Sequence, residues 1–247
     1  MSLLKAIAGP TALIIVGSPA NSERFHIHKQ LLCDCSTYFK AALNNGFIET
    51  QNQTIQLDDE DPVIFRTFVL WLYEKKLDKE AIPSSDETEV FQRHMLELYV
   101  FADKRGITNL ANDTITMLAC LWSCEDVVLD DIEWLFPLIP SKSQLYRLLL
   151  DNLILEVRAS SMTRGRLLGA GLPKAILVDL FLRSNRLPES FNLHTACFNS
   201  VCYYHLHDQR DGMSEEECIR RVEAGCNVWS PNINLKQQEW KWGWDWE

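Results

Sequence analysis

The chain has 247 residues, with 24 Lys plus Arg against 34 Asp plus Glu, and its formal charge at pH 7 is −10. A composition of 47% hydrophobic and 23% charged residues is typical of a folded protein and excludes disordered and collagen-like chains. Nucleic-acid backbones are bound by clustered cations, and the sequence shows no such cluster. No apolar run approaches the roughly 18 residues of a membrane span. We therefore expect neither a nucleic-acid partner nor a membrane partner.

The first hundred residues alternate short strands and helices, separated by turn residues. Asp61-Pro62 combines an N-cap with proline at the first helical position, and Ser36 is placed to cap a helix that begins at Thr37. The helix over 62–73 carries one core-facing stripe at spacing i, i+3, i+4 and i+7, formed by Phe65, Phe68, Val69 and Leu72. The predicted elements are strands over 12–16, 24–28 and 54–57 and helices over 29–35, 37–43 and 62–73.

After a charged loop over 74–87 the pattern is helical. Ser141 is placed to cap one helix, Pro173 to open another, and Ser214 with Glu217 forms a capping box. The glycine-rich stretch 160–171 is expected to be a loop and a subdomain boundary. The predicted helices cover 90–104, 108–122, 142–158, 174–183 and 215–223.

The order and spacing of these features over about ninety residues carry a resemblance. Residues 11–105 resemble the BTB (POZ) domain, and most closely the single-BTB proteins common in filamentous fungi. The implied fold class is α+β, with short strands surrounded by helices, followed by a mostly helical C-terminal region. The matching stretches are 11–17, 25–29 with 31–33, 36–39, 46–49, 55–57, 61–62 with Phe65, 71–73 and 98–104.

The resemblance implies an interaction module without a catalytic centre. BTB domains form homodimers and heteromeric contacts, or serve as the adaptor that hands a substrate to a cullin-based ubiquitin ligase. In cullin-binding members a hydrophobic–x–Glu triplet follows the second helix, and Phe47-Ile48-Glu49 stands at that place. An aromatic anchor beside an orienting carboxylate is typical of interface hot spots. Alternatively, Phe47 packs on its own helix and Glu49 is solvated.

Two departures from the family pattern favour a weak homodimer. Thr11 stands where many members carry an Asp that pairs with the basic residue after the His, here Lys29. Only residues 1–10 precede the first strand, although Leu3, Leu4 and Ile7 can form an amphipathic turn. We therefore expect Leu3, Leu4, Ile7 and Lys29 to supply the dimer contacts, if a dimer forms.

The second half carries a cysteine and histidine cluster. The pairs His194/Cys197 and Cys202/His205 have the short spacing that suits one tetrahedral zinc ion. The later Cys218 and Cys226 fit no familiar zinc module, and Tyr203, Tyr204 and Leu206 indicate a partly buried strand instead. We expect packed thiols, no metal and no cofactor; a zinc- or thiol-dependent activity in residues 190–230 is the least favoured alternative. The eight cysteines lie mostly in apolar segments, which favours reduced thiols in a cytoplasmic or nuclear protein.

The C-terminal segment is rich in tryptophan. Trp240, Trp242, Trp244 and Trp246 recur at period two, so an extended chain would place all four indoles on one face. Four exposed indoles form a costly patch, which predicts docking either on the chain's own helices or on a partner.

These observations predict a non-enzymatic interaction protein, either a cullin-ligase substrate adaptor or a homo-oligomeric scaffold or transcription co-regulator without ubiquitin transfer. The expected organisation is an N-terminal arm over 1–10, a BTB domain over 11–105, a helical extension over 106–160, a mostly helical region over 161–235 and a tryptophan-rich tail over 236–247.

Overall fold

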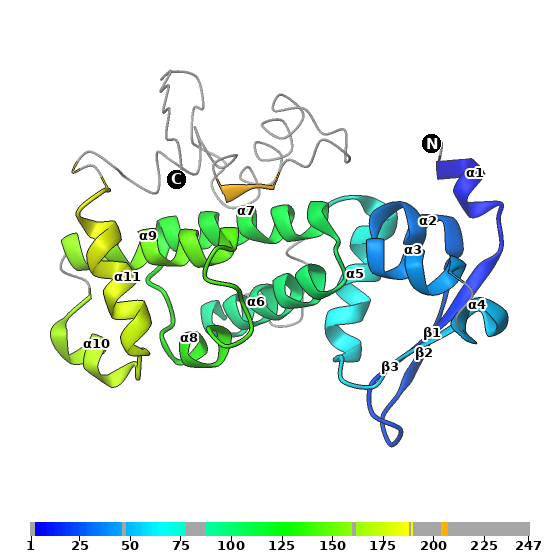
Figure 1. Ribbon diagram of the computed structural model, residues 1–247, viewed down its shortest axis with the longest axis horizontal. Helices are drawn as coiled ribbons and strands as arrows, with labels where there is room; N and C mark the ends of the chain where they lie inside the picture. The colour runs from blue at the N-terminus through cyan, green and yellow to red at the C-terminus, as the bar shows by residue number, and fades with distance from the viewer. Residues whose placement is uncertain are drawn as a thin grey trace. The chain divides into compact units, whose positions relative to one another are not determined.

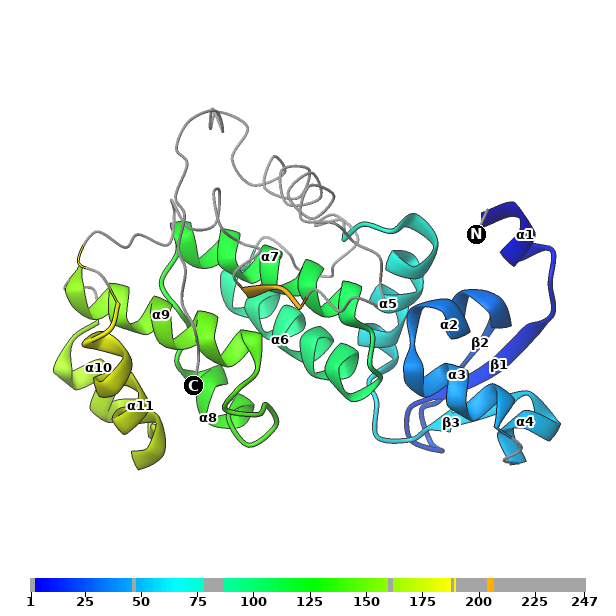
Figure 2. The same ribbon diagram turned by 45° about the horizontal axis from the view of Figure 1, so that its top comes forward.

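The computed structural model describes residues 3–45, 48–77, 87–159, 162–187, 189 and 204–206. The chain divides into two compact units, Met1–Thr114 and Ile115–Glu247. Figure 1 and Figure 2 label the helices and strands of both units. None of the helices within these described ranges is both long and apolar enough to cross a bilayer.

The first unit contains a small mixed sheet in the strand order β2-β1-β3. The central strand β1 (Thr11–Val16) pairs antiparallel with β2 (Glu23–His28) and parallel with β3 (Thr54–Leu57). Strand β1 buries Ala12, Ile14 and Val16 and leaves the intervening side chains more exposed. This alternation is what a strand with one face on the core requires, because successive side chains point to opposite faces.

The helices of the first unit begin where the sequence places capping residues. The Ser36 side chain accepts a hydrogen bond from the Phe39 amide at 3.1 Å, and the Asp61 carboxylate accepts one from the Val63 amide at 2.7 Å. Both predicted N-caps are therefore confirmed. These helices are α1 (Leu3–Ile7), α2 (Lys29–Cys35), α3 (Thr37–Asn44), α4 (Ile48–Asn52), α5 (Pro62–Glu74) and α6 (Thr88–Lys104).

Aromatic rings fill the core of the first unit. The Phe68 ring lies 5.2 Å from that of Phe101, 5.4 Å from that of Phe65 and 6.0 Å from that of Phe39, measured between centroids. All four side chains are fully buried. Such pairs contribute about 0.5–1.5 kcal/mol each beyond the burial of their area. Three helices, α3, α5 and α6, are thereby held around one cluster.

Arg105, at the end of α6, ties that end to α3. Its carbonyl accepts a hydrogen bond from the Ser36 hydroxyl at 2.6 Å, and its guanidinium pairs with Glu60 at 2.8 Å. The next residue, Gly106, has φ +58°, and a Cβ there would lie 2.1 Å from the Thr37 hydroxyl oxygen. Only glycine combines this backbone conformation with so close an approach.

The second unit is helical in its described part. Helix α7 (Thr108–Cys124) begins in the first unit and continues into the second. Further helices of the second unit are α8 (Asp130–Leu135), α9 (Gln144–Arg158), α10 (Arg164–Gly169) and α11 (Lys174–Ser184). The expected class, a small sheet with surrounding helices followed by further helices, is confirmed.

Two local expectations were wrong. Helix α9 is capped by Ser143 rather than Ser141. The Ser143 amide donates to the Pro140 carbonyl, so residues 141 and 142 form a turn and the helix begins after them. The glycine-rich stretch is not all loop, because the Thr163 side chain accepts from the Arg166 amide at 3.3 Å and starts α10. A cap of this kind offsets the helix penalty of roughly 1 kcal/mol that a glycine imposes.

Candidate functional site

The segment between α3 and β3, residues 45–53, carries the predicted cullin-type triplet. It is anchored on both sides, because Leu43 before it and Ile55 after it are buried. The Leu13 amide donates to the Gln53 carbonyl at 2.9 Å, and Gln53 makes the turn into β3 with a φ of +48°. The segment is therefore held at both ends by the core of the first unit.

Glu49 lies in the first turn of α4 and is half-buried. Glu49, which was expected to follow the predicted helix over 37–43, thus lies in a short helix of its own. A carboxylate in the first turn complements the positive end of the helix dipole. Phe47, the aromatic member of the triplet, lies outside the described residues.

The predicted dimer residues lie on two elements. Leu3 is the first residue of α1, and on the same helix Leu4 is 75% exposed and Ile7 37% exposed, while Ala6 is buried. Lys29 begins α2, and its ammonium group donates to the Leu43 carbonyl at 2.9 Å. Lys29 therefore stabilises the C-terminal end of α3, where a cation complements the helix dipole.

Of the predicted zinc candidates, only His205 lies within the described residues. Its side chain is buried, and its Nε2 atom is 3.0 Å from the Thr116 hydroxyl. No group of side chains suited to a metal occurs in the part of the chain that the structure describes. Residues 204–206 form no strand, in contrast to the alternation expected there. His194, Cys197 and Cys202 lie outside the described residues, as do Trp240, Trp242, Trp244 and Trp246.

The cysteine with a shifted pKa is poorly suited to nucleophilic chemistry. Burial raises the pKa of the Cys35 thiol to about 12, so this thiol stays protonated at neutral pH. Cys33, Cys35 and Cys124 are free thiols. Cys35 is therefore no candidate for an activated thiol.

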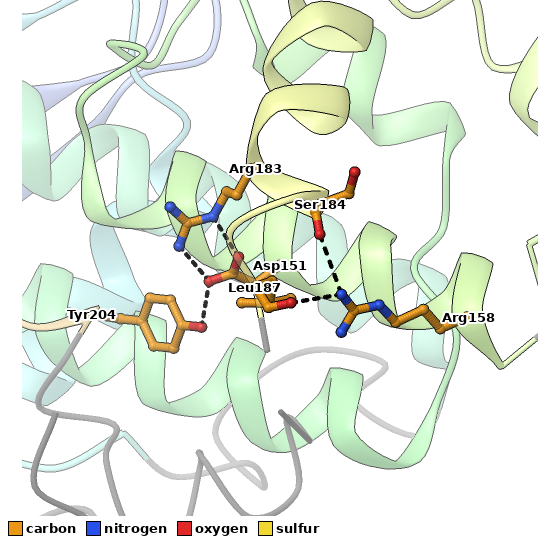
Figure 3. Close-up of polar contacts among 6 residues, drawn as sticks. All are labelled: Asp151, Arg158, Arg183, Ser184, Leu187 and Tyr204. Carbon is orange, nitrogen blue, oxygen red and sulfur yellow. Dashed lines mark hydrogen bonds and ion pairs between the residues drawn. The ribbon is translucent and has the colours of Figure 1, made fainter. Parts of the chain in front are cut away.

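A buried polar cluster in the second unit was missed by the sequence analysis. Asp151 of α9 is fully buried, and its carboxylate accepts hydrogen bonds from both Nε and Nη2 of Arg183 and from the Tyr204 hydroxyl, the last at 2.7 Å (Figure 3). The partners stand 32 and 53 residues away in sequence. The sequence signal that could have revealed this cluster was Asp151 itself. A charged residue among the apolar positions of helix α9 needs a buried partner.

His94 of α6 makes the stability of the first unit depend on pH. It is buried, its Nε2 atom lies 2.9 Å from the Thr67 hydroxyl, and desolvation lowers its pKa to about 4 from an ordinary value of 6.5. Between these two values the unfolded chain binds a proton that the folded chain does not. The contribution of His94 to the free energy of unfolding should therefore fall as the pH drops from 6.5 to 4, by about 3 kcal/mol.

A His94→Gln variant isolates this contribution, because the other titrating groups are common to both proteins. The unfolding free energies of parent and variant should be measured by urea denaturation between pH 4 and 7. The parent's advantage over the variant should shrink steadily with acidification. A difference that stays constant over this range would contradict the assignment.

The comparisons with known proteins agree with the fold. No curated protein matches the chain. Residues 10–106 match the family model of the BTB/POZ domain, a family of protein-interaction domains that are generally non-enzymatic. This range covers the sheet, the aromatic core and the segment between α3 and β3 described above. The chain therefore contains a BTB/POZ domain over residues 10–106, followed by further helices.

Proposed function

We propose that this protein is a non-enzymatic adaptor whose BTB domain binds a cullin scaffold and whose remaining chain recruits the substrate of a ubiquitin ligase. The observation that supports it is the triplet Phe47-Ile48-Glu49 between α3 and β3, with Glu49 half-buried in the first turn of α4. The segment is short and held at both ends by buried residues. Glu49 is thus presented with little loss of conformational entropy on binding.

The two side chains have separate roles in this proposal. Phe47 is the anchor, because an aromatic ring that becomes fully desolvated in a partner's pocket supplies much of an interface's affinity. Glu49 orients the encounter with a basic partner surface, which acts mainly on the rate of association. The chain's net charge of −10 should also speed association with a basic partner surface.

Substitution of the triplet tests this proposal. Phe47→Ala should weaken cullin binding by 2 kcal/mol or more, about thirtyfold, and Glu49→Lys should mainly slow association. Glu89→Lys is the matched control, because Glu89 is an exposed acid in the first turn of α6, far from the triplet in sequence. Binding is measured by calorimetry and by surface plasmon resonance, after each variant is shown to melt like the parent.

The results separate three cases. Parent binding that is weakened by the triplet variants and unchanged by Glu89→Lys supports the adaptor proposal. Equal binding by parent, Phe47→Ala and Glu49→Lys would overturn the triplet assignment. A folded parent that does not bind at all would leave the second candidate function, a scaffold or co-regulator that acts without ubiquitin transfer.

Exposed apolar residues on α1 favour that second candidate. Leu4 and Ile7 are exposed on a helix whose Ala6 is buried, and they offer a small self-complementary contact. Because Lys29 is engaged with the Leu43 carbonyl and Thr11 carries no charge, we expect a weak dimer.

Sedimentation velocity over a concentration series measures this dimer. A monomer fraction should be visible at micromolar protein, and Leu4→Asp should shift the equilibrium further to monomer. A dimer that persists at nanomolar concentration would contradict the expectation. So would a dimerisation constant that Leu4→Asp leaves unchanged.

A further inference from the structure

Helix α11 turns two of its charged residues inward and four of its large apolar residues outward. Its Asp179 and Arg183 contact α9, whereas four apolar side chains are between 46% and 67% exposed. A surface helix normally shows the reverse arrangement. These four residues are named the α11 apolar face: Leu177, Val178, Phe181 and Leu182.

The orientation of α11 is fixed by polar contacts with α9. The Tyr146 hydroxyl donates to the Asp179 carboxylate at 2.5 Å, and Arg183 Nη2 donates to Asp151 at 2.6 Å. At the C-terminal end, Arg158 donates to the carbonyls of Ser184 and Leu187, at 3.3 and 2.8 Å (Figure 3). Rotating α11 to bury its apolar face would break this set of contacts.

An exposed apolar patch held in place this firmly indicates a docking surface. Single exposed apolar side chains are ordinary, but a contiguous group on one helix face marks an interaction site. The spacing i, i+1, i+4 and i+5 places all four residues of the α11 apolar face on one stripe.

The chain itself contains a segment with complementary chemistry. Residues 239–247 combine four tryptophans at period two with three acidic residues and one lysine. Residues 164–187, which form α10 and α11, carry five basic residues and one acidic residue, against the acidic balance of the whole chain. The two segments therefore both carry apolar side chains, and their charges are of opposite sign.

The tail also has the reach to bind there. Tyr204 is hydrogen-bonded to Asp151, the same carboxylate that holds Arg183 of α11. From Leu206 to Trp240 the chain advances 34 residues, a span of about 50 Å if wholly helical and about 110 Å if fully extended. Because the tail and the α11 apolar face belong to one chain, their contact is intramolecular, so even a weak contact is favoured.

We propose that the α11 apolar face is the docking site of the tryptophan-rich segment 240–246 of the same chain. The indoles cover Leu177, Val178, Phe181 and Leu182. The acidic residues of the tail lie toward the exposed basic residues of this region, Arg164, Lys174 and Arg186. Each indole can bury about 150–250 Å², which is ample for a patch of four side chains. This proposal is independent of cullin binding.

Photo-crosslinking in the full-length chain tests the docking. Phe181 is replaced by benzoylphenylalanine, a conservative change at a side chain that is 67% exposed. The matched control carries the same group at Leu70 of α5, which is 44% exposed. Irradiated protein is separated by mass and digested, and the crosslinked peptides are sequenced by mass spectrometry. The expected result is a crosslink from position 181 to residues 239–247 within a monomer, and none to the tail from position 70.

Two other outcomes would overturn the proposal. Crosslinks confined to the dimer mass would identify a second copy as the occupant, and a monomer without any crosslink to the tail would exclude docking on α11. A Phe181→Glu variant supplies an independent measurement, since it should increase acrylamide quenching of tryptophan emission while Leu70→Glu does not. Equal quenching in both variants would also contradict the proposal.

Discussion

Replacing Asp151 with alanine should destabilise the second unit by about 3–5 kcal/mol, because it leaves a buried arginine without its counter-charge. The Asp151 carboxylate is fully buried and receives hydrogen bonds from Arg183 and Tyr204. The Arg183 side chain is only 13% exposed, so water cannot take over the lost contact. The midpoint of urea unfolding measures the change.

An exposed ion pair of the same unit provides the control. Asp126 pairs with Arg166 at 2.9 Å, and the two side chains are 50% and 37% exposed. Asp126→Ala should change the unfolding free energy by less than about 1 kcal/mol, because solvent screens such pairs. Similar losses in Asp151→Ala and Asp126→Ala would show that the buried cluster does not fix α9 and α11.

Replacing Trp71 with alanine should destabilise the BTB domain by about 3–5 kcal/mol. The Trp71 indole is 1% exposed, its ring stacks with that of Phe68 at 6.4 Å between centroids, and its N–H donates to Asp113 at 2.7 Å. For a chain of this size each kcal/mol lowers the melting temperature by roughly 2–4 °C. Thermal unfolding followed by circular dichroism should therefore show a clear shift.

A second substitution separates packing from hydrogen bonding at Trp71. Trp71→Phe keeps an aromatic ring against Phe68 but removes the donor to Asp113, so its loss should be smaller, on the order of 1–3 kcal/mol. An alanine variant that melts within 2 °C of the parent would contradict the role of Trp71 in the core.

Local signals in the sequence predicted much of the first unit. Asp61-Pro62 and Ser36 predict helix starts because capping depends on a side chain and a nearby amide. The stripe over 62–73 predicted a buried face, and Phe65, Phe68 and Leu72 are indeed buried, while Val69 is only partly covered. Trp71, outside that stripe, is buried as well, because neighbouring helices surround more of α5 than periodicity alone indicates.

Contacts between distant residues escaped prediction. Asp151, Arg183 and Tyr204 meet only through tertiary packing, and no local pattern specifies which partner a buried carboxylate finds. The same holds for the α11 apolar face: its residues were expected in a helix, but only the polar contacts with α9 decide which side is exposed. Helix α4, which contains Glu49 of the triplet, was not predicted, because a helix of five residues is too short to show a hydrophobic period.

Amide hydrogen exchange of the full chain, alone and with a purified cullin scaffold, locates the bound partner on the chain. The adaptor proposal predicts slower exchange in residues 40–57 on complex formation, because the segment between α3 and β3 becomes covered. Exchange in α9 should remain unchanged. A complex whose protection leaves residues 40–57 untouched, or a folded chain that forms no complex, would contradict the proposal.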